Sequence, residues 1–374
     1  MKKKIAIKAT SFLGTSPNGA EPFTIDFFCE YLEEFGYEVE IIGSEVIPDK
    51  LKRYKSSNYL NYLHLPKIAR MFLHIPVSII NVYIYCKRKK PDLIMCVGGV
   101  FYNGLSIFIV GKILGIKHLV RTAEDHFNFY KFCSTLRSKI FHFLLNRQIS
   151  KIVLKNADYV LTTGLKSKEF FVQKGVKEKR IWGIPGKIDS NLFYKKHKPS
   201  LERINLLPDK KIILFVGALS GIKGADLLPE IIRKINSNSE NFQFLIVGNE
   251  NEYGSEIKKN IEKNNFANVI FLNSLPRDEL IEIYSMCSLL IFLCRVGVGY
   301  GQVTIEATLC DLPVLSLNPG IDVEWWLKDK CCDSLDELVS KILSEDYSVA
   351  NFPASFDEEF IKVEYEKLFN QILN

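Results

Sequence analysis

Short apolar runs alternate with amphipathic segments along most of the chain. The apolar runs are four to six residues long, which is typical of buried strands. They predict strands at 5–9, 39–42, 93–97, 119–122, 159–162, 212–216, 242–247, 269–272, 289–293 and 314–317. Between these runs, apolar residues recur at helical spacing. In the segment 25–35 they are Ile25, Phe28, Cys29, Leu32 and Phe35, followed by Gly36 as a C-cap.

Three further segments, 166–174, 256–264 and 357–373, have the same helical character. Regular alternation of strands and helices predicts an α/β protein in which helices cover both faces of parallel sheets. Ligands of such sheets bind beyond the carboxyl ends of the strands. We therefore expect functional residues in the loops that follow the strands. The chain shows no internal repeat and no low-complexity tract.

The length of 374 residues suits two domains. A turn-rich exit at 183–187 and polar segments at 195–199 and 207–211 separate the strand at 159–162 from the strand at 212–216. We predict a first domain at 1–190 and a second at 191–356. The final helix, 357–374, forms a third segment.

Composition is ordinary for a soluble globular protein, with 47% apolar and 25% charged residues. The first eight residues hold a basic cluster with few apolar residues, which favours a buried strand over a signal peptide. The nine cysteines include no C-x-x-C pair, so we expect no disulfide, no zinc site and a reducing cytoplasm.

Charge divides unevenly between the halves. Residues 1–190 hold 30 Lys and Arg against 16 Asp and Glu, a balance of +14, and residues 191–374 hold 19 against 27, a balance of −8. A basic half suits anionic lipid, nucleic acid or a phosphorylated substrate. A solvated basic face is an equal alternative. Nucleic acid is disfavoured because the basic residues build no known recognition motif.

One mostly apolar segment, 68–86, is followed by four cations at 87–90. A spanning helix needs about 20 apolar residues, and this segment is interrupted by Arg70, His74, Pro76 and Asn81. We therefore expect a buried or interfacial helix. Upstream, basic residues and tyrosines interleave in a way that suits an anionic bilayer surface: Lys50, Lys52, Arg53, Tyr54, Lys55, Tyr59 and Tyr62.

The most informative stretch is 294–314, which follows the strand at 289–293 and contains Gly297, Gly299 and Gly301 before a helix that carries Glu306. Glycines let a backbone approach a ligand closely, and the N-terminus of a helix favours negative charge. The stretch predicts a phosphate site. A second candidate, Lys223, lies in a Gly-x-Lys-Gly turn just after the strand at 212–216. It can place a point charge on a phosphate, or it is simply an exposed turn lysine.

These segments resemble the group 1 glycosyltransferases, and within them the retaining enzymes of family 4. Residues 212–228 look like the opening of that family's C-terminal domain, and 244–248, 268–273 and 280–288 follow in its order. The stretch 294–314 resembles its signature, in which two glutamates bracket seven residues. The N-terminal half is similar more loosely, at 18–21, 32–39 and the linker 181–193.

The resemblance implies the GT-B architecture: two facing Rossmann-like domains, with a C-terminal helix that crosses back to the N-domain. Donor nucleotide-sugar binds mainly to the C-domain. Lys223 acts on the diphosphate leaving group, and Glu306 accepts two ribose hydroxyls, unless it is only a surface residue favoured by the helix dipole. The implied donor-binding set is Gly19, Gly217, Lys223, Gly248, Asn273, Leu275, Arg295, Gly299, Tyr300, Gly301, Gln302, Val303 and Glu306.

Two positions depart from the family pattern. Ala218 stands where an arginine is usual, and Val298 stands where the first signature glutamate would fall. The first change removes a cation from the diphosphate, and the second removes a carboxylate from the donor sugar. Arg295 either replaces the missing cation or forms a structural ion pair. If it replaces the cation, Arg295→Ala should weaken donor binding about as much as Lys223→Ala.

In the first half, Asp125 and His126 follow the strand at 119–122. Both are candidates for a general base at the acceptor hydroxyl, and a loop pair that only caps structure is the alternative. With Lys223 and Glu306 they complete the candidate catalytic set. The leaving diphosphate can itself take the proton in retaining transferases of this kind. No D-x-D motif lies near the site, so we expect neither a metal nor another cofactor.

The sequence thus predicts a cytoplasmic retaining glycosyltransferase that moves a hexosyl unit from a UDP- or GDP-sugar to a saccharide or lipid-linked saccharide. Polysaccharide or glycolipid synthesis at the inner membrane face, with peripheral contact through the basic half, fits that prediction. Two alternatives are an inactive partner subunit and another GT-B sugar-nucleotide enzyme, an epimerase or phosphorylase. Trp325 and Trp326 form either an acceptor or membrane contact or core packing.

Overall fold

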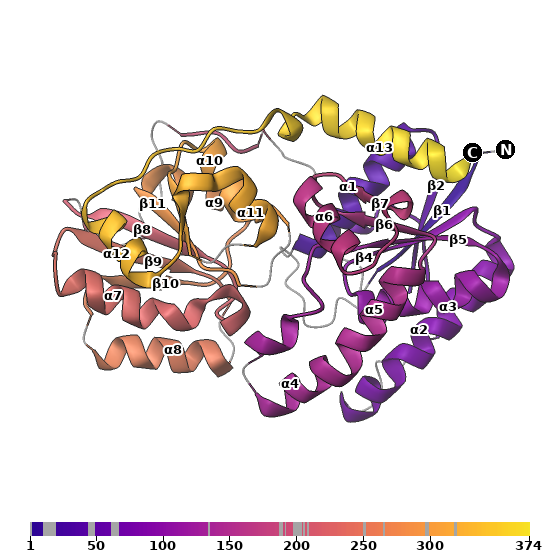
Figure 1. Cartoon of the computed structure of the whole chain (residues 1–374), viewed down its shortest axis with the longest axis horizontal. Helices are drawn as coiled ribbons and strands as arrows, with labels where there is room; N and C mark the ends of the chain where they lie inside the picture. The colour runs from indigo at the N-terminus through magenta and orange to yellow at the C-terminus, as the bar shows by residue number, and fades with distance from the viewer. Residues whose placement is uncertain are drawn as a thin grey trace. The chain divides into compact units, whose positions relative to one another are not determined.

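The computed structural model describes residues 2–9, 20–43, 49–60, 67–133, 135–186, 190, 192–196, 204, 206–207, 209–249, 252–264, 266–295, 299–317 and 320–374. The chain divides into two compact units (Figure 1). The first comprises Met1–Phe127, His142–Lys187 and Ser355–Asn374, and the second comprises Asn128–Phe141 and Ile188–Ala354. Each unit is built on one parallel sheet.

The first sheet has seven strands in the order β3-β2-β1-β4-β5-β6-β7. Every pairing is parallel. Its strands are β1 (Lys4–Lys8), β2 (Glu38–Ile42), β3 (Ser56–Ser57), β4 (Leu93–Val97), β5 (Lys117–Arg121), β6 (Tyr159–Thr162) and β7 (Ile181–Gly183). The central strand β4 is buried along its whole length, as expected when helices cover both faces of a parallel sheet.

Two helices far apart in sequence pack together on the first unit. The rings of Phe27 and Phe28, from α1 (Ala20–Glu34), meet the ring of Tyr365, from α13 (Glu358–Leu373), at 5.3 and 5.4 Å. A second layer consists of α2 (Lys67–Lys89), α3 (Leu105–Leu114) and α5 (Arg147–Asn156), in which α3 packs against both neighbours. Helix α6 (Leu165–Gln173) packs on β7. The terminal helix is therefore part of the core of the first unit.

Short helical elements connect these parts of the first unit. A π-helix, η2 (Val100–Gly104), precedes α3, and a second one, η4 (His142–Asn146), precedes α5. The helix before η4 in sequence, α4 (Leu136–Phe141), belongs to the second unit.

The second sheet has six parallel strands in the order β10-β9-β8-β11-β12-β13. They are β8 (Lys211–Val216), β9 (Phe242–Val247), β10 (Val269–Leu272), β11 (Leu289–Phe292), β12 (Val314–Leu317) and β13 (Cys331–Cys332). The helices of this unit are α7 (Leu228–Asn236), α8 (Glu252–Lys263), α9 (Arg277–Met286), α10 (Gln302–Leu309), α11 (Ile321–Leu327) and α12 (Leu335–Leu343). Apolar residues of β8, β9 and β11 form one buried core with α7, α8 and α12.

The predicted α/β class with parallel sheets is confirmed, whereas the two units differ from the predicted domain bounds in placing 128–141 with the second unit. All ten predicted strands are present, and α1, α6, α8 and α13 correspond to the predicted amphipathic segments. The three strands that the sequence did not indicate, β3, β7 and β13, are two or three residues long and lie at or next to sheet edges. Such short strands carry no apolar run, because their pairing is set by the neighbouring strand and not by their own pattern.

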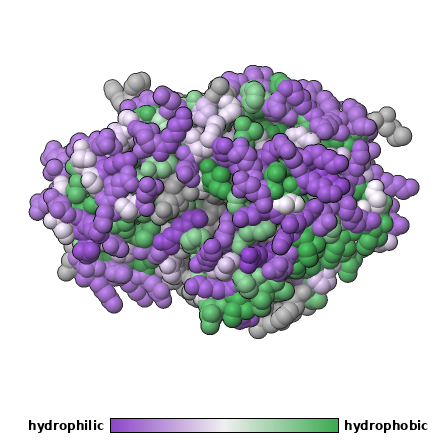
Figure 2. All heavy atoms as spheres, in the orientation of Figure 1, coloured by the Kyte–Doolittle hydropathy of each residue, from purple (hydrophilic) through white to green (hydrophobic). Residues whose placement is uncertain are grey.

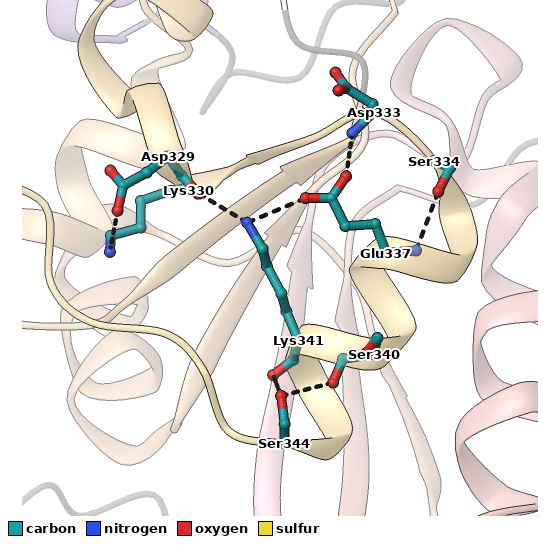
Figure 3. Close-up of polar contacts among 8 residues, drawn as sticks. All are labelled: Asp329, Lys330, Asp333, Ser334, Glu337, Ser340, Lys341 and Ser344. Atoms are coloured by element: carbon teal, nitrogen blue, oxygen red, sulfur yellow. Dashed lines mark hydrogen bonds and ion pairs between the residues drawn. The ribbon is translucent and has the colours of Figure 1, made fainter.

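Helix α12 shows how a local sequence fixes an element (Figure 3). The Ser334 hydroxyl accepts a hydrogen bond from the Glu337 amide at 3.1 Å, and the Glu337 carboxylate accepts one from the Asp333 amide at 2.8 Å. These contacts satisfy amides that a helix start leaves unpaired. The Lys341 ammonium lies 3.2 Å from the Glu337 carboxylate and donates to the Asp329 carbonyl. The helix is therefore tied to the segment that leads into β13.

The segment 68–86 forms α2, with Pro76 inside the helix. Among the described residues, none of the helices is long and apolar enough to cross a membrane. The basic residues upstream are engaged within the fold. Arg53 pairs with Asp26 and Glu30 at 2.8 and 3.0 Å, and Tyr54 is buried. Lys52 and Lys55 lie near Asp49 and Glu38. These contacts tie the described cations to acids of the first unit, and a bilayer contact of this stretch stays a prediction.

Candidate functional site

The order in which the chain adds strands to the second sheet reverses between the adjacent strands β8 and β11. From β8 the chain moves outward to β9 and β10, and from β11 it moves the other way to β12 and β13. Ligands of open α/β sheets bind beyond the carboxyl ends of the strands at such a reversal. The loops that begin there are 217–224 and 293–301. Most of the predicted donor-binding residues belong to these loops and to α10.

Glycines allow neighbouring loops at this edge to touch backbone to backbone. Gly224 has φ +71°, and a Cβ on it would come within 2.2 Å of the Leu293 carbonyl oxygen. A Cβ on Gly248 would lie 1.8 Å from the Gly217 carbonyl oxygen. The Arg295 amide donates to the Ile222 carbonyl at 3.0 Å. No residue with a side chain fits at 224 or 248 without moving the backbone.

Lys223 lies at this edge as an exposed side chain. It ends the 3-10 turn η6 (Gly221–Lys223), and its ammonium donates to the Cys294 sulfur at 3.8 Å. Within the described part of the chain its ammonium meets no carboxylate. An unpaired cation at the switch point can approach a phosphate without first breaking an ion pair.

Arg295, in contrast, is paired. Its guanidinium forms two parallel hydrogen bonds to the Asp226 carboxylate, at 3.1 and 2.9 Å, and a weaker one to the Gly221 carbonyl. This bidentate geometry is the favoured one for an arginine and a carboxylate. Of the two roles considered from the sequence, the structural ion pair is the one that these contacts describe. Ala218, where the family has an arginine, is exposed.

Glu306 is buried, with 3% of its surface exposed. It is the fifth residue of α10, and its carboxylate accepts hydrogen bonds from the Arg277 guanidinium at 2.7 Å and the Tyr284 hydroxyl at 3.0 Å. Both donors come from α9. Burial, together with the Glu306 carboxylate, raises the pKa of Tyr284, so its hydroxyl stays protonated and donates. The reading of Glu306 as a surface residue is wrong.

The sequence did not single out Arg277 or Tyr284. Arg277 also stacks on the ring of Phe193, 5.4 Å from its centroid. These contacts join α9, α10 and the segment before β8. No sequence spacing signals them, because the partners of Glu306 lie more than 20 residues away on another helix.

The glycine loop runs directly into α10. Gly301 has φ +67°, and a Cβ there would come within 2.9 Å of the Phe292 ring. The first amides of a helix have no acceptor within it, so the backbone N–H groups of Gln302 and Val303 can bind an anion. Gly299 is half-buried and Tyr300 is buried. Val298, the position of the missing glutamate, lies outside the described residues, as does Gly297.

Trp326 packs against this loop and donates a hydrogen bond to it. Its side chain is buried, its indole N–H donates to the Tyr300 carbonyl at 3.4 Å, and its ring stacks on Phe352. The ring of Trp325 lies 6.2 Å from that of Tyr300. The tryptophan pair therefore serves packing around Tyr300.

The remaining candidates for donor binding lie at the same carboxyl edge of the second sheet. Gly217, Gly248 and Asn273 each follow a strand directly, and Leu275 lies two residues further. The Gly217 amide donates to the Val247 carbonyl, and the Gly248 amide to the Leu272 carbonyl. One edge thus unites the predicted set, except Gly19, which lies outside the described residues.

Asp125 and His126 belong to the first unit and follow β5. The Asp125 carboxylate accepts a hydrogen bond from the Phe127 amide at 2.9 Å, a local turn contact. His126 is buried, and its Nε2 lies 3.0 Å from the Thr122 hydroxyl. Burial lowers the pKa of His126, so the ring is neutral near pH 7. These contacts agree with the capping role and leave the choice of base open.

Next to them lies a buried cation, Arg121, whose role the sequence did not indicate. It ends β5, its guanidinium lies 5.7 Å from the centroid of the Phe28 ring, and burial lowers its pKa while the Tyr365 hydroxyl raises it. The Tyr365 hydroxyl donates to the Pro185 carbonyl at 3.0 Å. Among the described residues, no carboxylate contacts Arg121. Those residues also contain no group of three His, Cys, Asp or Glu that could hold a metal ion.

Residues 198–330 match the family model of glycosyl transferases group 1. The N-acetylglucosaminyltransferase subunit GPI3 of Saccharomyces cerevisiae, which is named for phosphatidylinositol, is 25% identical over 81% of this chain and 65% of its own length. The chain spans between about half and two thirds of the length of the first curated relatives that it matches.

Two solved structures share the fold over almost the whole chain. Sucrose-phosphate synthase from Thermosynechococcus elongatus superposes with a TM-score of 0.75 at 17% identity, covering 99% of each chain. Anabaena HepE, in complex with UDP and glucose, gives 0.74 at 14% identity and covers 98% of this chain and 99% of its own. With its two parallel-sheet units, the chain has the GT-B fold. Within that class, its residues 198–330 resemble the group 1 glycosyltransferases. Membership of family 4 stays a prediction.

Proposed function

We propose that this chain is a retaining glycosyltransferase that moves a hexosyl unit from a nucleotide-sugar to a saccharide or lipid-linked saccharide. The observation that carries the proposal is Lys223, an exposed lysine with no carboxylate partner among the described residues, at the switch point of the second sheet. It lies at the same edge as the first amides of α10 and the buried Glu306. A nucleotide-sugar donor needs a cation, backbone donors and a ribose acceptor, and in this proposal Lys223, the first amides of α10 and Glu306 take these three roles.

In the proposed reaction the bond between the sugar C1 and the diphosphate oxygen breaks, and a bond from C1 to the acceptor oxygen forms on the same face. Negative charge develops on the diphosphate. The Lys223 ammonium and the amides of Gln302 and Val303 stabilise that charge, where it counts most for the rate. The acceptor hydroxyl proton passes to the leaving diphosphate, so no separate base is required. In this proposal Glu306, whose carboxylate is held by Arg277 and Tyr284, accepts the ribose hydroxyls.

The acceptor belongs to the first unit in this proposal. The positive net charge of residues 1–190 suits an acceptor that carries phosphate or lies at an anionic membrane. The GPI3 relative, which is named for a phosphatidylinositol acceptor, supports a lipid-linked substrate.

The test is binding of UDP-, GDP- and dTDP-sugars, by calorimetry or saturation-transfer NMR, to the full chain and two lysine variants. Lys223 follows β8 at its carboxyl end, and Lys211 begins the same strand at the other end, paired with Glu345. We expect Lys223→Ala to weaken donor binding about 10- to 100-fold, as for loss of a hydrogen bond to a charged group. Lys211→Ala should leave it unchanged. Equal affinity in both variants would contradict the site.

A second candidate is a catalytically weak partner subunit with the same fold. It is favoured by Ala218, which leaves an exposed methyl group where the family has a cation, and by the engagement of Arg295 with Asp226. The GPI3 relative is itself named a subunit. Saturable donor binding without any hydrolysis or transfer over a broad acceptor panel would favour this candidate. Slow hydrolysis of one donor, abolished in Lys223→Ala, would favour the transferase.

A further inference from the structure

The helix layer of α2, α3 and η4–α5 leaves large apolar side chains in solvent. Their exposed fractions range from 38% to 64%. They are Leu73, Ile80 and Tyr83 of α2, Ile113 of α3, Phe143, Leu144 and Leu145 of η4, and Ile152 of α5. Since α3 packs against both α2 and α5, these residues share one layer of the first unit. Figure 2 shows apolar surface along the lower right of the molecule, where Figure 1 places α2 and α3. We refer to the eight residues as the helix-layer patch.

The charged residues along the elements of this patch are mostly basic. Residues 142–157 contain three Lys and Arg and no Asp or Glu, and residues 67–91 contain six and none. Lys87, Arg88 and Lys89 are exposed at the end of α2, and Lys151 is exposed on α5 beside Ile152. The acid nearest in sequence to α5, Asp158, is already paired with Lys112 at 2.6 Å. The patch therefore combines exposed apolar side chains with cations that few acids balance.

Several cations lie against aromatic rings of the same layer. The Arg147 guanidinium lies 5.3 Å from the centroid of the Phe143 ring, and the Lys87 ammonium lies 5.8 Å from that of Tyr83. Aromatic rings next to cations suit the boundary between lipid headgroups and acyl chains, where the ring is half desolvated and the cation meets phosphate.

Other occupants fit less well. A nucleic acid would use the cations but not eight apolar side chains. A second copy of this chain, docked through the same surface, would oppose cations to cations, because the two patches of a twofold interface are identical. An anionic bilayer uses both features at once.

We propose that the helix-layer patch binds the surface of an anionic lipid bilayer. The proposal rests on the proposed function in one respect, since such docking would bring the first unit to a lipid-linked acceptor. It commits to a surface different from the basic stretch at 50–55, whose described cations pair with acids of the fold.

The experiment is flotation of the full chain with vesicles of phosphatidylcholine alone and of phosphatidylcholine mixed with phosphatidylglycerol. We expect binding to the mixed vesicles only. Leu144→Ser combined with Ile152→Ser should weaken binding about tenfold or more, and Lys151→Glu about fivefold or more, the value of about one cation at an anionic surface.

The matched controls are in the same unit. Phe360→Ser combined with Val363→Ser removes two apolar side chains of α13 that are 48% and 44% exposed, and Lys179→Glu inverts an exposed cation outside the patch. These variants should bind vesicles like the parent chain. Circular dichroism checks that each variant is folded.

Three outcomes would overturn the proposal: no binding to mixed vesicles, equal binding to neutral vesicles, or equal loss in patch and control variants. A patch variant that abolishes self-association, measured by light scattering without lipid, would assign the patch to a second copy instead. Nucleotide-sugar binding is measured on the same samples. Donor binding without vesicle binding would contradict bilayer binding by the helix-layer patch but not the proposed function. Vesicle binding without donor binding would contradict the proposed function but not bilayer binding by the patch.

Discussion

The carboxyl edges of the two sheets have the same strand order but differ in what they leave open. At the second sheet, Lys223 is exposed and has no carboxylate partner among the described residues, and glycines bring the loops into contact. At the first, Arg121 and His126 are buried, and Arg121 lies against the Phe28 ring and the Tyr365 hydroxyl. Topology therefore provides the place for a ligand, and the side chains decide whether an anion can reach it. That is why the donor is assigned to the second unit.

The two edges also treat buried charge differently. The second edge pairs the Glu306 carboxylate with a guanidinium and a hydroxyl. The first leaves the Arg121 guanidinium with a ring and a hydroxyl. A substitution that removes one partner of a buried ion pair lowers stability strongly, because the other charge stays buried without a partner. A substitution that removes a buried charge with no ionic partner lowers stability less.

The largest expected effect follows from the Glu306 pair. Glu306→Ala should lower the free energy of unfolding by about 3 kcal/mol, because it leaves the partly buried Arg277 cation without its carboxylate. Urea denaturation measures the change. Glu324→Ala, which removes an exposed glutamate of α11, is the control and should change it by less than about 0.5 kcal/mol. A loss no larger than in the control would mean that the pair contributes nothing.

The second-largest effect is a loss of stability at low pH that is expected in the first unit. The four histidines of the first unit with described side chains, His74, His118, His126 and His142, all have a pKa lowered first by burial, to about 4 for His74. Below about pH 6.5 the unfolded chain takes up protons that the folded unit does not. Stability is therefore full above that pH and falls as the pH drops toward the folded pKa values.

Lowering the pH from 7 to 5 should cost the first unit about 2 kcal/mol for His74, whose pKa burial lowers to about 4. Hydrogen exchange resolved by peptide follows each unit separately. His126→Gln should flatten the pH dependence in the peptides around β5. An equal loss in peptides of β8 and β9 would show that the histidines are not the cause.

The third effect tests the unpaired guanidinium. Arg121→Met should change the free energy of unfolding by only about 1 kcal/mol, because the lost ring contact and hydrogen bond are offset by relief of desolvation. Thermal or urea unfolding beside Glu306→Ala compares the two edges directly. If Arg121→Met costs as much as Glu306→Ala, Arg121 has an anionic partner that these contacts do not include.

The smallest effect concerns Arg295. Its ion pair with Asp226 is partly exposed, so Arg295→Ala should cost at most about 1 kcal/mol of stability and leave donor affinity nearly unchanged. The sequence alone left open an equal role with Lys223. Calorimetric titration of the preferred donor decides: a loss in Arg295→Ala as large as in Lys223→Ala would restore Arg295 as the second cation on the diphosphate.

The sequence could point to the second edge because the patterns there are local. A glycine loop between a strand and a helix, and a Gly-x-Lys-Gly turn after another strand, are contiguous patterns with a physical meaning. The contacts of Glu306 were out of reach, since Arg277 and Tyr284 come from another helix. Burial of Arg121 depends on α13, which follows it by more than 200 residues.

The contrast between local patterns and distant contacts also explains which parts of the fold were predicted. Ten strands were predicted because each carries an apolar run, and β3, β7 and β13 were not, because two or three residues form no pattern. The exposed residues of η4 were also unpredictable. A run such as Phe143, Leu144 and Leu145 normally indicates a core helix, and only the packing of α5 and α3 shows that these side chains face solvent.

Hydrogen exchange of the full chain with and without a UDP- or GDP-sugar would locate the donor. If the diphosphate and ribose bind at the second sheet, exchange slows in peptides covering 217–224 and 299–306, and that protection is lost in Lys223→Ala but not in Lys211→Ala. Protection confined to peptides of the first unit, or unchanged in Lys223→Ala, would contradict the assignment of the donor to the second sheet.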